Sequence, residues 1–313
     1  MASRILTLGE TLGVAVTPVG RPLRSAAYAD LHTAGAESTV AIGLSRLGLS
    51  SCWLGVVGAD EIGARVLRDL SAEGVDTSSV RVDGSATTAF MLRELRTAEL
   101  TRVTYYRTDS AGSRLTPADV DAAFDAFRPT LVHLTGITPA LSETACAAAE
   151  HAVLRARNAG VEVSIDVNHR PTLPGSGRAI ETMRRLVPQS DVVFVGDDEL
   201  HVLVAETQPE PAAAALSTMG VVEVVLKRGA AGALARVDGT IHRIDGMRVR
   251  VADVIGAGDS FVAGYLAARG YDLEVAERLR WGTVCAARTV GTHGDWEGLP
   301  TRSELDTGHG VIR

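Results

Sequence analysis

A glycine-rich segment that ends in an aspartate is the part of this chain best suited to chemistry. Residues 253–264 read DVIGAGDSFVAG, with Gly256, Ala257 and Gly258 directly before Asp259. Glycine lets the backbone approach a ligand closely, and the helix expected next would direct its unpaired N–H groups at the loop, where phosphate binds. A carboxylate there would repel phosphate unless it accepts a proton. The segment therefore predicts an anion hole beside a general base, as phosphoryl transfer to a hydroxyl requires.

The same segment has simpler interpretations. A Gly-x-Gly sequence before a helix is often only a turn, and aspartate is common near helix starts. The dinucleotide-binding pattern would require glycine at position 261, where Phe261 stands, and the chain has no Gly-Lys-Ser or Gly-Lys-Thr of a Walker loop. Short motifs also match by accident, so further residues must decide between these interpretations.

Polar residues at two other places are candidates for ligand contacts. Tyr105 and Arg107 alternate, so on a strand they share one face, and arginine suits bidentate recognition of a carboxylate. The alternative is a solvated strand face. Asn168 and Arg170 alternate directly after a predicted strand over residues 161–165, a position where polar residues often contact ligands.

Lysine is almost absent from the chain. Of 31 Lys and Arg residues, the one lysine is Lys227, and Gly229 and Gly232 follow it. Chance could explain this, but a compact ammonium also differs functionally from a guanidinium fork. Gly35, between two alanines before a predicted helix, could form a wall for a polyhydroxylated ligand or could be a simple turn.

Composition excludes several classes of protein. The chain has 313 residues, 46% of them hydrophobic, and a net charge of −7, which argues against binding to nucleic acid. Three scattered cysteines are too few for a disulfide framework or a zinc site. The N-terminus lacks the features of a signal peptide, and no apolar run approaches the roughly 20 residues of a membrane span. We expect a cytoplasmic protein with no membrane partner.

Short β-branched runs alternate with helical patterns, which predicts an α/β fold with a mainly parallel sheet and helices on both faces. Ligands of such sheets bind at the C-terminal strand ends. Strands are predicted over residues 5–8, 52–57, 131–134, 161–165, 192–195 and 222–227. Helices are predicted over residues 38–47, 62–73, 117–127, 142–158, 179–187, 210–219, 259–269 and 273–290.

Two strand-like segments, residues 10–33 and 84–107, do not follow this alternation. Within the second, residues 87–95 and 102–106 resemble a hairpin. We expect the two segments to form a small β lid over the edge of the main sheet, and the tail after about residue 306 to be disordered. The large domain would then comprise residues 1–9, 34–83 and 108–313.

Together these residues resemble the ribokinase-like, or PfkB, family of carbohydrate kinases. Residues 253–264 fit the late signature of that family throughout, and residues 34–37 match its early signature loosely. The order of strands and helices agrees over essentially the whole chain. The resemblance implies a three-layer ribokinase-like fold with a β lid, and ATP-dependent phosphorylation of a sugar.

Within the family, the chain is most similar to 2-keto-3-deoxygluconate kinases. Residues 105–107 with 110–113, residues 166–170 and residues 294–300 each resemble segments of those enzymes. Two arginines directed at one pocket also suit a substrate with a carboxylate. A sugar acid is therefore the expected substrate, and the alternatives are a kinase for a neutral sugar (fructose, ribose) or nucleoside, and a catalytically weak sugar-binding regulatory protein.

The resemblance also implies roles for single residues. Asp259 would be the general base, and the backbone of Gly256, Ala257 and Gly258 the anion hole. Glu199 would hold Mg²⁺ through water, and a monovalent cation would lie near Asp253. The implied substrate contacts are Gly35, Thr39, Tyr105, Arg107, Arg170 and Asp259. The implied ATP contacts are Asn168, Lys227, Gly229, Gly232, Gly256, Gly258 and Thr283.

Four positions depart from the pattern of the family. Thr39 and Gly196 stand where asparagine is usual, Met91 where tyrosine is frequent, and Ile255 where threonine is common. Most of them lie on the substrate side, so they bear on the identity of the sugar more than on the type of reaction.

The edge of the lid sheet predicts a homodimer or a higher homo-oligomer.

Overall fold

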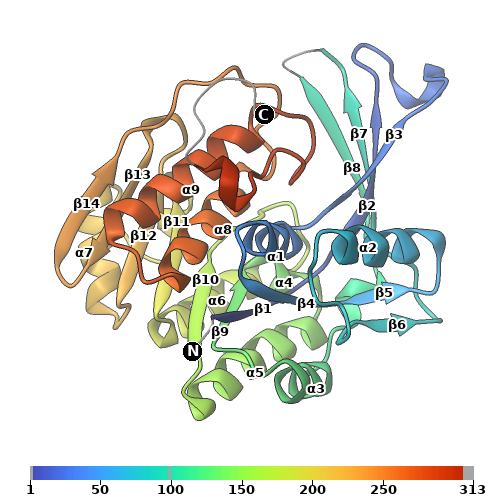
Figure 1. The fold of residues 1–313 in the computed structure, drawn as a ribbon. Helices are drawn as coiled ribbons and strands as arrows, with labels where there is room; N and C mark the ends of the chain where they lie inside the picture. Colours follow the sequence, from blue (N-terminus) through green and yellow to red (C-terminus); the bar gives the residue numbers. More distant parts are fainter. Residues whose placement is uncertain (1–2, 98–99, 306–313) are drawn as a thin grey trace.

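The computed structural model describes residues 3–97 and 100–305, which form a large α/β part with a smaller sheet beside it (Figure 1). The large part contains an eight-stranded sheet in the order β14-β13-β12-β11-β10-β9-β1-β4. Its strands are β1 (Arg4–Leu8), β4 (Ser50–Leu54), β9 (Leu131–Thr135), β10 (Glu162–Asp166), β11 (Val192–Gly196), β12 (Glu223–Lys227), β13 (Ala233–Val237) and β14 (Thr240–Ile244). Neighbours from β4 to β12 are parallel, whereas β13 and β14 are antiparallel.

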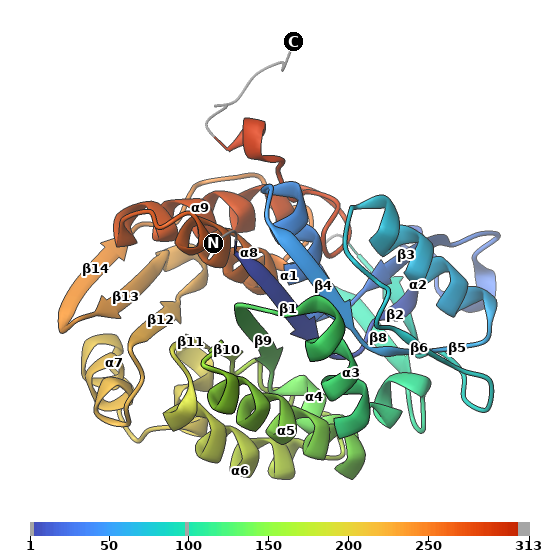
Figure 2. The ribbon, with the colours of Figure 1, turned by 60° about the horizontal axis from the view of Figure 1, so that its bottom comes forward.

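Helices cover both faces of this sheet, as Figure 2 shows. One apolar cluster packs α3, α5, α6 and α7 on one face, and a second packs α1, α2, α8 and α9 on the other. The helices are α1 (Ala36–Arg46), α2 (Glu61–Ala72), α3 (Pro117–Phe127), α4 (Ile137–Leu141), α5 (Glu143–Ala159), α6 (Ser176–Leu186), α7 (Pro209–Thr218), α8 (Ala257–Gly270) and α9 (Val275–Thr289). The predicted α/β fold with a mainly parallel, doubly covered sheet is confirmed.

Helix α8 is fixed to the sheet by aromatic packing. Phe194 of β11 is fully buried, and its ring lies edge-on to Tyr265 at 5.3 Å and to Phe261 at 6.5 Å between centroids. Edge-to-face rings at such distances add to the free energy of burial. The sheet therefore sets the position of α8, whose first turn carries Asp259.

A second, four-stranded sheet has the order β3-β2-β7-β8 and stands beside the large part, at the upper right of Figure 1. Its strands are β2 (Leu12–Thr17), β3 (Asp30–Ala34), β7 (Phe90–Leu95) and β8 (Thr101–Tyr106). It has a small apolar core of its own that includes Leu12, Val14 and Met91. We call this sheet the lid.

Three details differ from the predicted elements. The strand predicted over residues 52–57 is interrupted at Gly55, where a Cβ would lie 2.2 Å from the Trp53 ring, so a larger residue does not fit there. Its second half is β5 (Val56–Gly58), which pairs with β6 (Arg81–Asp83) in a separate sheet. The strands β13 and β14 were not predicted. Helix α8 begins at Ala257, so Asp259 lies inside the helix.

The predicted disorder after residue 306 falls outside the described residues. Among residues 3–97 and 100–305, no helix has the length and apolar character needed to cross a membrane.

Candidate active site

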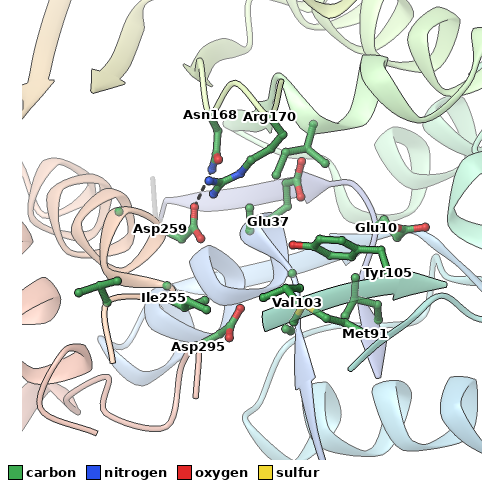
Figure 3. Close-up of a pocket in the computed structure, with 18 of the residues that line it drawn as sticks. Glu10, Glu37, Met91, Val103, Tyr105, Asn168, Arg170, Ile255, Asp259 and Asp295 are labelled. Atoms are coloured by element: carbon green, nitrogen blue, oxygen red, sulfur yellow. Dashed lines mark hydrogen bonds between the residues drawn. The ribbon is translucent and has the colours of Figure 1, made fainter. Parts of the chain in front are cut away.

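A cavity of about 540 Å³ lies where the lid meets the carboxyl ends of the parallel strands. Lid strand β8, the ends of β10, β11 and β12, and the first turns of α1 and α8 all contribute to its wall (Figure 3). Ten of the residues predicted from the sequence to form the site line it: Gly35, Tyr105, Arg107, Asn168, Arg170, Glu199, Lys227, Gly256, Gly258 and Asp259. The fold therefore brings together segments that are far apart in the chain.

The start of α8 is a tight turn that only glycine can form. Gly256 has φ +75°, and a Cβ on it would lie 2.0 Å from the carbonyl oxygen of Asp295. Glycine is therefore required there both by conformation and by space. Ser260 N–H donates the first helical hydrogen bond, to Gly256 at 2.8 Å. The preceding N–H groups belong to the first turn, which has no intrahelical acceptors.

Asp259 is buried at this helix start and faces the cavity. Asn168 Nδ2 donates a hydrogen bond of 2.9 Å to its Oδ1, drawn as the dashed line in Figure 3. Burial raises the pKa of Asp259 to about 6, and Asp166 adds to the rise, whereas Lys227, Arg170 and Asn168 oppose it. A carboxylate with such a pKa is a stronger base than a solvated aspartate and is mostly ionised near pH 7.

The one lysine of the chain forms a partly buried ion pair. Lys227 Nζ lies 2.6 Å from both carboxylate oxygens of Asp166, which is fully buried at the end of β10. Burial lowers the pKa of Lys227, but Asp166 and Glu199 raise it by more, so it stays charged. The result is a fixed positive charge in the cavity wall, near Asp259.

Glu199 uses both carboxylate oxygens on the backbone. They accept hydrogen bonds from the N–H groups of His169 and Gly196, each at 2.8 Å. Burial raises the pKa of this carboxyl group. Among the described residues there is no group of three acidic, histidine or cysteine side chains that could hold a metal ion directly.

The two arginines of the cavity differ in what they already contact. Arg107 Nη2 lies 2.5 Å from Oε2 of the buried Glu10, and its guanidinium lies 5.3 Å from the Tyr105 ring centre. Arg170 is exposed and forms no ion pair with any side chain in residues 3–97 and 100–305. Figure 3 shows Arg170 extending toward Asp259. Arg170 is therefore the cation available to a bound anion.

Several predicted contact residues lie away from this cavity. Thr39 is fully buried in α1, and Gly229 and Gly232 lie in the turn after β12, so none of them lines either large cavity. Thr283, on α9, lines a second cavity of about 960 Å³. Its Oγ1 is buried without a hydrogen-bond partner among the described residues.

Nearly the whole chain matches one protein family. The pfkB family of carbohydrate kinases matches residues 3–302. This chain belongs to that family. Among its PfkB relatives, the 2-dehydro-3-deoxygluconokinase of Bacillus subtilis (strain 168) is 35% identical over 303 residues, which cover 96% of this chain and 93% of that protein.

Solved structures agree with the assignment of the fold. A PfkB protein from Polaromonas sp. JS666 has a TM-score of 0.88 and 35% identity, and the match covers 98% of this chain and 100% of that one. A fructokinase double mutant from Vibrio cholerae O395, solved in its fructose-, ADP- and potassium-bound form, has a TM-score of 0.85 at 23% identity, covering 97% of each chain. This kinase therefore has the ribokinase-like fold.

Four acidic residues of the cavity wall were not anticipated as site residues: Glu10, Glu37, Asp198 and Asp295. Glu37 in α1 is fully buried, and its Oε1 accepts hydrogen bonds from Thr135 at 2.7 Å and Thr138 at 2.9 Å. Burial raises the pKa of Glu37, and that of Asp295, to about 7. The position of Glu37, directly after Gly35 and Ala36 at the start of a predicted helix, could have marked it as a site residue. Its burial depends on tertiary packing, which a single sequence does not reveal.

We predict that kcat/KM falls at acid pH, which gives the pH profile an acid limb. Because burial raises the pKa of Asp259 to about 6, the base form is present above that pH and is lost as the pH falls through it. We expect kcat/KM to fall about tenfold per pH unit well below pH 6. In Asn168→Ala the limb should move to higher pH, since a hydrogen bond to the charged form is lost. Steady-state assays from pH 4.5 to 8.5 measure both profiles, and an unshifted limb in the variant would assign the titration to another group.

Proposed function

We propose that this PfkB kinase transfers the γ-phosphoryl group of ATP to a hydroxyl of a small sugar acid, with 2-keto-3-deoxygluconate as the favoured substrate. The observation that carries the proposal is that Arg170, in the same cavity as Asp259, forms no ion pair with any described side chain. A guanidinium without a protein partner suits a ligand carboxylate. The similarity to a 2-dehydro-3-deoxygluconokinase supports the same class of substrate.

In this proposal the acceptor hydroxyl lies beside Asp259. The carboxylate accepts the hydroxyl proton while the sugar oxygen forms a bond to the γ-phosphorus, and the bond to the departing ADP oxygen breaks. The N–H groups at the start of α8 stabilise the charge on the phosphoryl oxygens. Lys227, held by Asp166 at the cavity wall, adds a fixed positive charge. Its predicted place among the ATP contacts is consistent with this role.

The second cavity suits the base of the nucleotide. Its wall includes apolar side chains such as Ile244, Val249 and Val284, together with the hydroxyl of Thr283, which no described group hydrogen-bonds. An adenine ring offers one polar edge and two apolar faces. Asp295 lines the first cavity, and Thr292 and Glu297 line the second, so one short segment borders both, and a nucleotide that follows it would extend from Thr283 toward Asp259.

Mg²⁺ usually keeps several waters and binds through substrate phosphates with one or two carboxylates. Asp198 and Glu199, both in the wall of the first cavity, would hold the hydrated ion. When bound, Mg²⁺ would neutralise part of the charge of the triphosphate. Gly229 and Gly232, in the turn after β12, line neither of the two cavities. Their place in the ATP site stays a prediction.

A neutral sugar is the second candidate substrate. The observation in its favour is the ion pair of Arg107 with Glu10 at 2.5 Å, which leaves one guanidinium rather than two for a carboxylate. The fructokinase from Vibrio cholerae, of the same fold, was solved with fructose. The two candidates differ in what they require of Arg170.

A panel of substrates with an arginine variant distinguishes them. We expect turnover of ATP with keto-deoxy sugar acids to exceed that with neutral hexoses and nucleosides. Arg170→Met should raise the KM for the acid about 10- to 100-fold, the equivalent of one hydrogen bond to a charged group, and should leave the KM for a neutral sugar unchanged. Arg185→Met, which removes a surface arginine paired with Glu150, is the matched control. An unchanged KM for the acid in Arg170→Met contradicts the sugar-acid proposal.

We also infer that the lid mediates a homodimer. Large apolar side chains of the lid are exposed: Leu31 by 53%, Val103 by 36%, Tyr105 by 49% and Tyr106 by 60%. The strands β3 and β8 are the edges of this sheet, and exposed apolar edges invite pairing with another chain.

Light scattering after size exclusion tests the dimer. We expect the mass of two chains for the wild type and of one chain for Leu31→Lys. Leu154→Lys changes an equally exposed leucine on α5 and should leave the mass unchanged. A monomeric wild type at micromolar concentration rules the lid dimer out.

A further inference from the structure

A buried arginine connects the lid to the loop that precedes α8. Arg93 lies on lid strand β7, and only 2% of the residue is exposed. Its Nη2 pairs with Oδ2 of Asp253, and its Nη1 lies 3.6 Å from Oδ1 of Asp295. A buried guanidinium is costly without anionic partners. This side chain is therefore committed to the two carboxylates.

Both partners of Arg93 flank the anion hole. The second oxygen of Asp253, Oδ1, accepts a hydrogen bond of 3.1 Å from the N–H of Ile255, directly before Gly256. The backbone of Asp295 lies against Gly256, where a Cβ would approach its carbonyl oxygen to 2.0 Å. One guanidinium thus holds the two segments between which Gly256 lies.

This arrangement does not fit the monovalent cation implied near Asp253. A cation at that carboxylate would lie beside a fixed, buried positive charge, and like charges in a poorly screened site repel strongly. The fructokinase of the same fold from Vibrio cholerae was solved with a potassium ion. Here the carboxylate of Asp253 is already paired with the guanidinium of Arg93. A cation that binds this carboxylate would have to displace the guanidinium.

We propose that Arg93 is a positioning residue: its guanidinium supplies the permanent positive charge at Asp253 that orders the Gly256 loop, so that turnover needs no added monovalent cation. The proposal rests on the phosphoryl transfer at Gly256 and Asp259 described above. Because Arg93 belongs to the lid, the lid takes part in forming the anion hole as well as in covering the substrate.

Two further contacts join the lid to the same C-terminal segment and provide a matched control. His32 Nδ1 lies 2.7 Å from Oε1 of Glu297, and Trp296 Nε1 donates to the carbonyl oxygen of Thr33 at 3.0 Å. Neither contact involves Asp253 or Gly256. A variant of His32 therefore weakens lid docking without removing the charge beside the anion hole.

The test compares kcat of the wild type, Arg93→Met, Arg93→Lys and His32→Gln in potassium and in choline salts. We expect the wild type to turn over equally in both salts. Arg93→Met should lose about 10- to 100-fold in kcat, as misplaced reacting groups do, and should regain part of it with potassium or with guanidinium at a non-denaturing concentration. Arg93→Lys should retain more activity than Arg93→Met, and His32→Gln should lose less kcat than Arg93→Met and gain nothing from potassium.

Several results would overturn this role. They are a wild type that potassium activates several-fold, an Arg93→Met variant with wild-type kcat, and equal losses in Arg93→Met and His32→Gln. If Arg93→Met does not fold, the salt comparison on the wild type and the Arg93→Lys variant still decides.

Amide hydrogen exchange separates this proposal from the proposed function. Exchange at residues 253–259 should be faster in Arg93→Met than in His32→Gln, and unchanged exchange there contradicts the role of Arg93 even without turnover data. A wild type that phosphorylates no sugar of the panel contradicts the proposed function instead.

Discussion

The close contact between Gly256 and the backbone of Asp295 is the constraint on which the site depends. A side chain at position 256 would collide with a carbonyl oxygen at 2.0 Å, and the φ of +75° disfavours any other residue. This contact fixes where α8 begins, while Phe194 fixes how the rest of the helix lies on the sheet. Together they place the first-turn N–H groups and Asp259 at one point of the cavity.

Burial of charged groups then determines the pKa values of the acids around this point of the cavity. Asp259, Asp295 and Glu37 are all buried, and burial raises each pKa to between about 6 and about 7. The compensating cations are fixed by acids of their own, Lys227 by Asp166 and Arg93 by Asp253. Arg170 has no such partner in the described chain, so the cavity keeps one guanidinium for a ligand. The proposed transfer to an acidic sugar requires a general base and an available cation in the same cavity, the roles proposed for Asp259 and Arg170.

Much of this architecture could be predicted from sequence. Alternating strand and helix patterns predicted the parallel sheet, and residues 253–264 predicted the turn at the start of α8 because glycines permit such a turn and a helical pattern follows them. Local patterns could not predict the pairing of distant charges. Glu10 with Arg107, Arg93 with Asp253 and the burial of Glu37 depend on how the lid docks.

The proposed reaction depends most on Asp259 as the base beside the anion hole, and the Asp259→Asn variant tests this role most directly. Its side chain has nearly the same shape but cannot accept the proton as a carboxylate does. With a sugar acid as acceptor, we expect kcat to fall by about 10² or more, with ATP affinity in calorimetric titration nearly unchanged. Turnover near that of the wild type would contradict the account.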